Sequence, residues 1–153
     1  MKTLAPILSI LLIVVLTPLT ATAGPADDAN AVVDRWSAAY NSNDPEAMVA
    51  VYWPDATLLG TTSPVMSEGT EALRTYYSVL KGSDLKSEIG DRQTITVSDN
   101  AVVVVGFYRF SRNVDGKPIV SAPSRFTMLI VRRDGGWKIT HHHSSPHVQP
   151  KQQ

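Results

Sequence analysis

The sequence predicts an α+β fold in which helices from the first half of the chain pack on one face of an antiparallel sheet from the second half. Apolar residues recur at helical spacing up to about residue 81, whereas β-branched and aromatic runs separated by turn residues dominate from Lys86 onward. The chain contains no internal repeat and no low-complexity tract. Helices followed by strands in this way are typical of an α+β layer architecture.

Residues 1–23 have the features of a signal peptide. Lys2 precedes an apolar run from Leu4 to Leu16, and the small residues Ala21 and Ala23 flank Thr22 just before Gly24. A membrane anchor is the alternative, but the run is short for a span of about 20 apolar residues, and Pro18 interrupts its far side. We therefore expect cleavage after Ala23, export to a periplasm or to the medium, and no membrane attachment afterwards.

The composition limits the function of the remaining chain. Residues 24–145 are expected to form one domain, followed by a flexible tail at 146–153. The whole chain has 14 Lys and Arg against 14 Asp and Glu, and one of the basic residues lies in the signal peptide. This balance gives no reason to expect a basic face for nucleic acid, so no nucleic-acid partner is expected. The absence of cysteine excludes disulfides and thiol catalysis.

Three helices are expected in the first half. The first covers about Asp28 to Asn41, and a short second one follows Asp44 as N-cap and Pro45 as first helical residue. The third covers about Thr70 to Lys81 and ends at Gly82. The residues on their apolar faces include Val32, Val33, Trp36, Met48, Leu73, Tyr76, Tyr77 and Leu80.

The second half predicts a meander of strands joined by hairpin turns. The run Ala101 to Val105 is apolar at every position, which indicates a strand covered on both faces. We expect the helices on one face and another subunit on the other, so the chain should form a homo-oligomer, most simply a dimer. The predicted strands are Gln93–Ser98, Ala101–Asn113, Ser124–Arg133 and Trp137–His143.

Three stretches of the sequence resemble a known family. They are Asn43 to Ala47, Glu68 to Leu73, and above all Arg132 to Ser145, which reads RRDGGWKITHHHSS. The chain resembles the nuclear transport factor 2-like superfamily, in particular the association domain of calcium/calmodulin-dependent protein kinase II and its exported bacterial, polyketide-cyclase-like relatives. The resemblance implies three N-terminal helices on a curved antiparallel sheet that forms a conical pocket. The same fold hosts isomerases, cyclases, dehydratases, binding proteins and assembly modules.

The resemblance also implies a pocket arginine at Arg109, where the kinase association domain receives a carboxylate ligand. Two further pocket arginines of that domain fall on Met128 and Ser144 here, whereas Arg125 lies nearby as a second guanidinium. Arginine suits a carboxylate because its planar group donates two parallel hydrogen bonds. Two placements stay open for Arg109: the pocket, or the solvated outer face of the sheet.

The triple histidine is divided by strand alternation. His141 and His143 should share a face with Trp137 and Ile139, while His142 points the other way. A His-x-His pair can hold a metal, but a metal site normally needs a third ligand; His147 is the nearest further histidine, and no obvious Asp or Glu accompanies it. Hydrogen-bonded histidines in a core or interface are the alternative. We therefore expect no metal and no cofactor. His141 and His143 are the candidate acid or base of an enzyme.

Aromatic hydroxyls supply the remaining candidates for a ligand site. Tyr40, Tyr52, Tyr76 and Tyr108 are expected either to line the pocket or simply to fill the core. Two functions therefore stay open. One is a noncatalytic binding or assembly module whose pocket holds a small apolar or carboxylate ligand. The other is a cofactor-independent isomerase, cyclase or hydratase that uses a pocket histidine.

Overall fold

A computed structural model describes residues 24–147 of the chain. The predicted signal peptide and the last six residues of the predicted tail lie outside this range. Pro146 ends the last strand, and the His147 N–H donates to the carbonyl of Pro123, so these two residues belong to the domain and not to a flexible tail. The helices are α1 (Pro25–Ser42), α2 (Pro45–Ala50), α3 (Gly69–Tyr77) and a following 3₁₀ turn, η1 (Ser78–Leu80).

The capping residues explain where the first two helices begin and end. Gly24 is the N-cap of α1 and Pro25 its first residue, three positions before the predicted start. Asn43 ends α1 in the left-handed conformation, with φ of 58°. Asp44 then caps α2 as predicted, because its side chain accepts a hydrogen bond from the N–H of Glu46. This tight connection folds α2 back beside α1.

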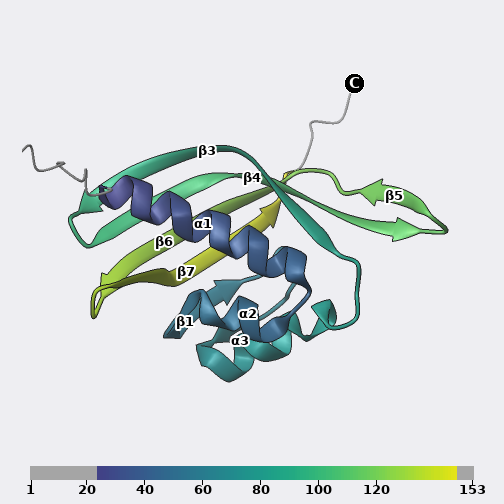
Figure 1. Ribbon diagram of the computed structural model, residues 1–153, viewed down its shortest axis with the longest axis horizontal. Coiled ribbons are helices and arrows are strands. Elements are labelled where there is room, and N and C mark those ends of the chain that lie inside the picture. The colour runs from purple at the N-terminus through teal and green to yellow at the C-terminus, as the bar shows by residue number, and fades with distance from the viewer. Residues whose placement is uncertain (1–23, 148–153) are drawn as a thin grey trace, which may run out of the picture.

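The strands form one curved sheet with α1 lying across its concave face (Figure 1). The sheet order is β2-β1-β7-β6-β4-β3, and β5 pairs with β4. All pairs are antiparallel except β1 with β7, so the sheet is mixed and the prediction of a purely antiparallel sheet is wrong at this pair. The strands are β1 (Tyr52–Leu59), β2 (Met66–Glu68), β3 (Lys86–Ser98), β4 (Ala101–Val114), β5 (Lys117–Val120), β6 (Ser124–Arg133) and β7 (Gly136–Pro146).

Two-residue turns connect the hairpins of the second half. Asp115 and Gly116 have φ of 51° and 74°, and Asp134 and Gly135 have φ of 49° and 77°. Positive φ at both central residues matches the twist of the flanking strands, which explains the Asp-Gly choice. The first of these turns starts β5, which the sequence analysis missed. Figure 1 shows the β4–β5 hairpin projecting from the body of the domain.

A β-bulge at Thr140 reverses the expected facing of the histidines. Leu129 of β6 pairs with His141, whereas the next residue, Ile130, pairs with Ile139, so Thr140 is the extra residue. Ile139 and His142 consequently both lie on the buried face, at 0% and 1% exposure. A regular strand would have placed them on opposite faces.

The core lies between α1 and the concave face of the sheet. Val102 and Val104 of β4 are fully buried there, whereas Val103 and Val105 face the convex side and are half-buried. The apolar run Ala101 to Val105 is therefore a strand of which residues 24–147 fully cover only one face. No helix within residues 24–147 is long and apolar enough to span a membrane.

Candidate functional site

A cavity of about 500 Å³ lies between α1, the α3–η1 segment and the concave face of the sheet. Such a volume is in the range of small-molecule sites. Aromatic and small polar side chains from distant parts of the sequence surround it. Its lining consists of Trp36, Tyr40, Leu58, Thr61, Thr62, Tyr76, Tyr77, Val79, Leu80, Tyr108, Phe110, Ser121, Ser124, His142 and Ser144.

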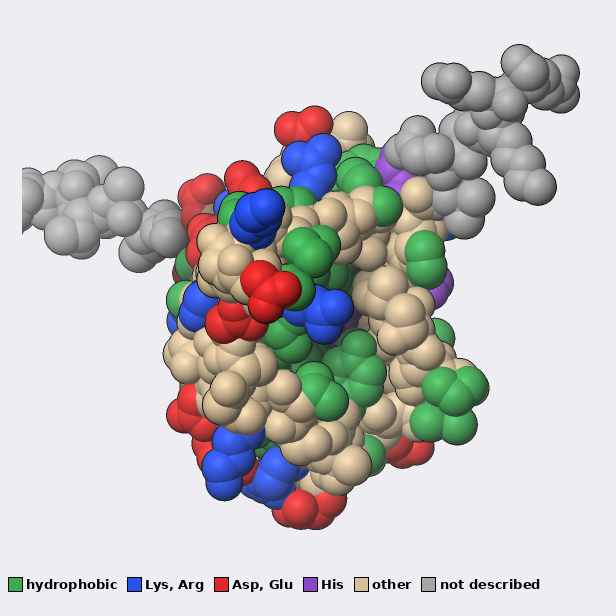
Figure 2. Space-filling view, turned by 90° about the vertical axis from the view of Figure 1, so that its right-hand side faces the viewer, with side chains coloured by type: hydrophobic (Ala, Val, Ile, Leu, Met, Phe, Trp, Pro, Cys, Tyr) green, Lys and Arg blue, Asp and Glu red, His purple; other side chains and the backbone are tan. Residues whose placement is uncertain are grey.

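The lining contains no Asp, Glu, Lys or Arg side chain from the described part of the chain. Its polar groups are hydroxyls and one imidazole, set among rings and aliphatic side chains. In the space-filling view of Figure 2, the face shown is hollowed near its centre, and the side chains within the hollow are mainly hydrophobic. The arrangement favours an uncharged ligand, because a buried charge without a partner is strongly unfavourable.

His142 is the centre of the polar groups at the base of the cavity. Its Nδ1 atom lies 2.9 Å from the hydroxyl oxygen of Tyr52, and its Nε2 atom lies 3.4 Å from that of Tyr108. The hydroxyls of Thr61 and Ser144 pair with each other in the same lining. The imidazole therefore contacts a hydroxyl on each of its two nitrogens.

The network continues from His142 to Tyr52, which lies behind the lining, and to Trp36 and Tyr77, which also line the cavity. The indole N–H of Trp36 donates to the Tyr52 hydroxyl at 2.8 Å and lies 3.4 Å from the Tyr77 hydroxyl. The Tyr52 and Tyr77 hydroxyls are 2.6 Å apart. Each of these side chains is at most 3% exposed. Buried polar groups in a dry environment stabilise the fold only when they are paired, so this network is strongly constrained.

Burial keeps these groups uncharged. Desolvation, together with a smaller effect of the neighbouring His141 and His143, lowers the pKa of His142 to about 3. Desolvation likewise raises the pKa of Tyr52 and Tyr108 well above the usual range. At neutral pH the site consists of a neutral imidazole and protonated phenols.

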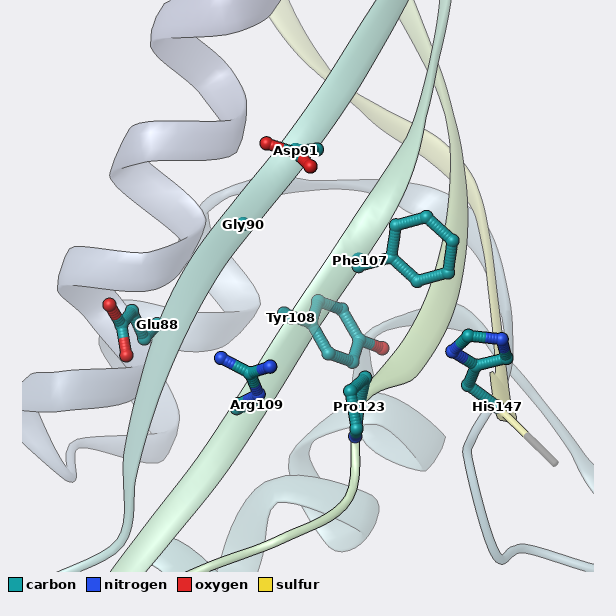
Figure 3. A pocket seen from close by; sticks show the side chains of 8 residues that line it. All are labelled: Glu88, Gly90, Asp91, Phe107, Tyr108, Arg109, Pro123 and His147. Atoms are coloured by element: carbon teal, nitrogen blue, oxygen red, sulfur yellow. The ribbon is translucent and has the colours of Figure 1, made fainter. Parts of the chain in front are cut away.

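A second depression lies on the convex face of the sheet and contains Arg109 (Figure 3). Its volume is about 440 Å³, and Glu88 and Asp91 contribute carboxylates to its lining. Glu88 is the cross-strand partner of Arg109. The ring of Phe107 packs 5.2 Å from the imidazole of His147 at one side. This depression has charged side chains in its lining, whereas the described lining of the cavity has none.

Of the two placements left open for Arg109, the structure has the one on the outer face of the sheet and not the one in the pocket. Its side chain is exposed, and its neighbour Tyr108 lines the cavity from the opposite face of β4. Arg125 is also exposed and donates to the carbonyl of Pro146. Alternation along β4 and β6 sends both guanidinium groups to the convex side, so neither contributes an anion contact inside the cone.

The candidate histidines are likewise displaced by the bulge. His143 is exposed, and His141 is half-buried with its Nδ1 atom 2.7 Å from the hydroxyl of Thr57. Neither lines the cavity, whereas His142 does. The pattern of alternating residues had excluded His142, and no turn-forming residue marks the bulge at Thr140. The sequence therefore contained no signal that His142, and not His141 or His143, would line the cavity.

The predicted tyrosines are brought together. Tyr40, Tyr76 and Tyr108 line the cavity, and Tyr52 lies directly behind it in the hydrogen-bond network. Tyr77 and Trp36, expected only as core residues, complete the network. Within residues 24–147, no group of three His, Asp or Glu side chains is arranged to hold a metal ion.

Comparisons with known proteins give the same fold. A putative calcium/calmodulin-dependent protein kinase II association domain from Xanthomonas campestris is 30% identical, with a TM-score of 0.72 over 90% of this chain and 99% of that chain. An uncharacterised protein with a cystatin-like fold from Caulobacter vibrioides is 25% identical, with a TM-score of 0.68 over 81% of this chain and 89% of that chain.

A putative dehydratase of the NTF2-like family from Streptomyces avermitilis is similar in fold only, at 14% identity and a TM-score of 0.69 over 80% of this chain and 95% of that chain. No curated protein matches the sequence. The model of the SnoaL-like domain matches residues 29–149, which include both the cavity and its hydrogen-bond network. The chain therefore belongs to the SnoaL-like family of nuclear transport factor 2-like proteins.

Proposed function

We propose that this domain binds a small, largely apolar molecule in the cavity and does not transform it. The observation that carries the proposal is the composition of the lining, which combines about 500 Å³ of space with aromatic walls and no charged side chain from the described residues. Apolar walls with a few placed polar groups are typical of small-molecule sites. The carboxylate ligand expected from the sequence is not favoured, because Arg109 and Arg125 lie on the other face.

The lining gives less support to an isomerase, cyclase or hydratase. A general base must accept a proton near neutral pH, and His142, the cavity histidine, has a pKa lowered to about 3 by burial. Both of its nitrogens already contact hydroxyl groups, and none of the described residues that line the cavity with it carries a carboxylate. Binding is therefore the function that this set of residues supports best.

Export and self-association are part of the proposal. The order of charge, apolar run and small residues in 1–23 supports cleavage after Ala23 and a periplasmic or secreted domain. The strip formed by Val103, Val105 and Phe107 on the convex face supports a homo-oligomer, most simply a dimer, because residues 24–147 leave this strip only partly covered. No nucleic acid and no cofactor enter this function.

Ligand-observed NMR with a library of neutral and anionic aromatic fragments tests the proposal. Thr62 lies at the exposed edge of the cavity, so Thr62→Trp should fill the entrance. Thr96→Trp adds the same side chain at an exposed position of β3 and is the matched control. We expect fragments that bind the unmodified protein and the control but not Thr62→Trp.

Two results would contradict the proposal. Fragments that bind equally to Thr62→Trp and to the unmodified protein would place the site elsewhere. Turnover of a bound enol or ketone into an isomer, followed by NMR over time and abolished by His142→Gln, would favour the enzyme instead.

A further inference from the structure

The hydrogen-bond network behind the cavity has a direction, which follows from counting its protons. A neutral imidazole carries one N–H, on either Nδ1 or Nε2. Each phenol carries one O–H, and the Trp36 indole donates only. The contacts among Trp36, Tyr52, Tyr77 and His142 therefore allow two arrangements, one for each tautomer.

If Nε2 carries the proton, every donor in the network is paired. The Tyr52 hydroxyl donates to Nδ1 of His142 across 2.9 Å, and the Tyr77 hydroxyl donates to the oxygen of Tyr52 across 2.6 Å. The Trp36 N–H donates to the same oxygen across 2.8 Å. The Tyr52 oxygen then accepts two hydrogen bonds and donates one, which is its full capacity.

If Nδ1 carries the proton, one donor loses its partner. Nδ1–H must then donate to Tyr52, and Tyr52 must donate to Tyr77. The Tyr77 hydroxyl would have no acceptor among the described side chains, because its other contact is the Trp36 N–H, itself a donor. Leaving a buried hydroxyl unpaired is unfavourable, so the first arrangement is preferred.

The direction of the hydrogen bonds in the network also determines the orientation of the Tyr108 hydroxyl in the cavity. With the proton on Nε2, His142 donates to the Tyr108 oxygen, and the O–H of Tyr108 is turned away from the imidazole. Tyr108 lines the cavity together with Thr61 and Ser144, whose hydroxyls lie within hydrogen-bonding reach of its own. Its hydroxyl becomes a stronger donor, because a phenol whose oxygen already accepts a hydrogen bond is polarised toward donation.

We propose that the ligand is an uncharged, largely apolar molecule with a carbonyl oxygen that accepts the hydrogen bond of Tyr108. This inference rests on the binding function proposed above. A carbonyl accepts without requiring a donor site in return. A carboxylate would place a charge in a cavity whose described lining has no cation to pair with it. An apolar molecule without oxygen would leave the Tyr108 hydroxyl only the hydroxyls of Ser144 and Thr61, which already pair with each other.

Three probes with the same aromatic body test the ligand class: acetylnaphthalene, ethylnaphthalene and naphthoate. Titration calorimetry with the purified protein should give the ketone an affinity about fivefold higher than the hydrocarbon, as expected for one hydrogen bond. The anion should bind at least about tenfold more weakly than the ketone. Equal affinity for the ketone and the hydrocarbon would overturn the carbonyl contact and leave binding in the cavity intact.

Two further results would also overturn the inference. Naphthoate binding more tightly than the ketone would mean that the site receives an anion. If none of the three probes binds, the carbonyl inference is lost, whereas the binding function itself is judged on the fragment library and on Thr62→Trp.

Variants identify the donor. In Tyr108→Phe the preference for the ketone over the hydrocarbon should disappear. In Tyr40→Phe, which removes a hydroxyl from the same lining without touching His142, the preference should persist. Heteronuclear NMR of the imidazole, independent of ligand and of these variants, should show the proton on Nε2 of His142. A proton on Nδ1 would overturn the direction of the network.

Discussion

The Nδ1 atom of His142 lies 2.9 Å from the hydroxyl oxygen of Tyr52, a hydrogen bond between two neighbouring parallel strands. Tyr52 begins β1 and His142 lies near the end of β7, so residues 90 positions apart meet beneath the cavity. Trp36 of α1 donates to the same oxygen. The polar end of the cavity and the packing of α1 on the sheet therefore depend on the same few atoms.

The buried imidazole predicts a loss of stability in mild acid. The pKa of His142 is lowered to about 3 by burial, so between this value and about 6.5 the unfolded chain binds a proton that the folded chain does not. The free energy of unfolding should be highest above pH 6.5 and should fall by about 1.4 kcal/mol per pH unit at most as the pH drops. Urea unfolding at a series of pH values measures this slope.

Other titratable groups limit the pH range in which the change in the free energy of unfolding can be assigned to His142. Burial also lowers the pKa of His141, which adds in the same direction. Hydrogen bonds from Arg74 and Arg133 lower the pKa of Glu46 and Asp55, so their contributions are lost only below about pH 4.5. The slope from pH 6.5 to 5 should flatten in His142→Gln and persist in the exposed His143→Gln. An unchanged slope in His142→Gln would contradict the assignment.

Removing the Tyr52 hydroxyl should destabilise the domain. In Tyr52→Phe, the Trp36 N–H keeps only the 3.4 Å contact to Tyr77, and Nδ1 of His142 loses its partner. We expect a loss of about 1–3 kcal/mol in the free energy of unfolding. The half-buried Tyr40 is the comparison, since Tyr40→Phe should cost less than about 0.5 kcal/mol. Equal losses in the two variants, measured by urea unfolding, would show that the network adds nothing.

The elements of the fold were largely predictable because their signals are local. Asp44 and Pro45 start α2, and β6 spans Ser124–Arg133 as predicted, because capping, turn chemistry and apolar alternation all act within a few residues. The parallel pairing of β1 with β7 could not be predicted in this way. It depends on how strands distant in sequence meet in the sheet.

The site was predictable only in part, mainly because the bulge at Thr140 changes which histidine faces the cavity. The tyrosines were found because aromatic residues on helix and strand faces point to a core or cavity. The bulge at Thr140 moved His142 in and left His141 and His143 out, and threonine is an ordinary strand residue that gives no warning of it. Arg109 was assigned by resemblance alone, and alternation along β4 placed it outside the cavity.

Gly60 is required for Tyr76 to lie against the cavity. A Cβ atom at position 60 would overlap the phenol end of the Tyr76 ring. In Gly60→Ala the ring must move, so we expect a loss of about 1–3 kcal/mol in the free energy of unfolding. Gly60→Ala introduced into a Tyr76→Leu background should cost much less, because the clash is gone. A double-mutant cycle from urea unfolding measures the difference, and additive losses would exclude the contact.

The exposed position of Phe107 on the convex face allows a test of self-association by introducing a charge there. Its ring is 39% exposed on β4, beside the half-buried Val105 and outside the cavity. If this face joins two copies of the chain, Phe107→Glu places an unpaired carboxylate in the interface and should convert the oligomer to a monomer. Light scattering coupled to size exclusion measures the mass. Val65→Glu, at a 65% exposed position between β1 and β2, should leave the mass unchanged. A wild-type mass of one chain at tens of micromolar protein, or an oligomer that survives Phe107→Glu, would mean that this apolar strip is not the contact.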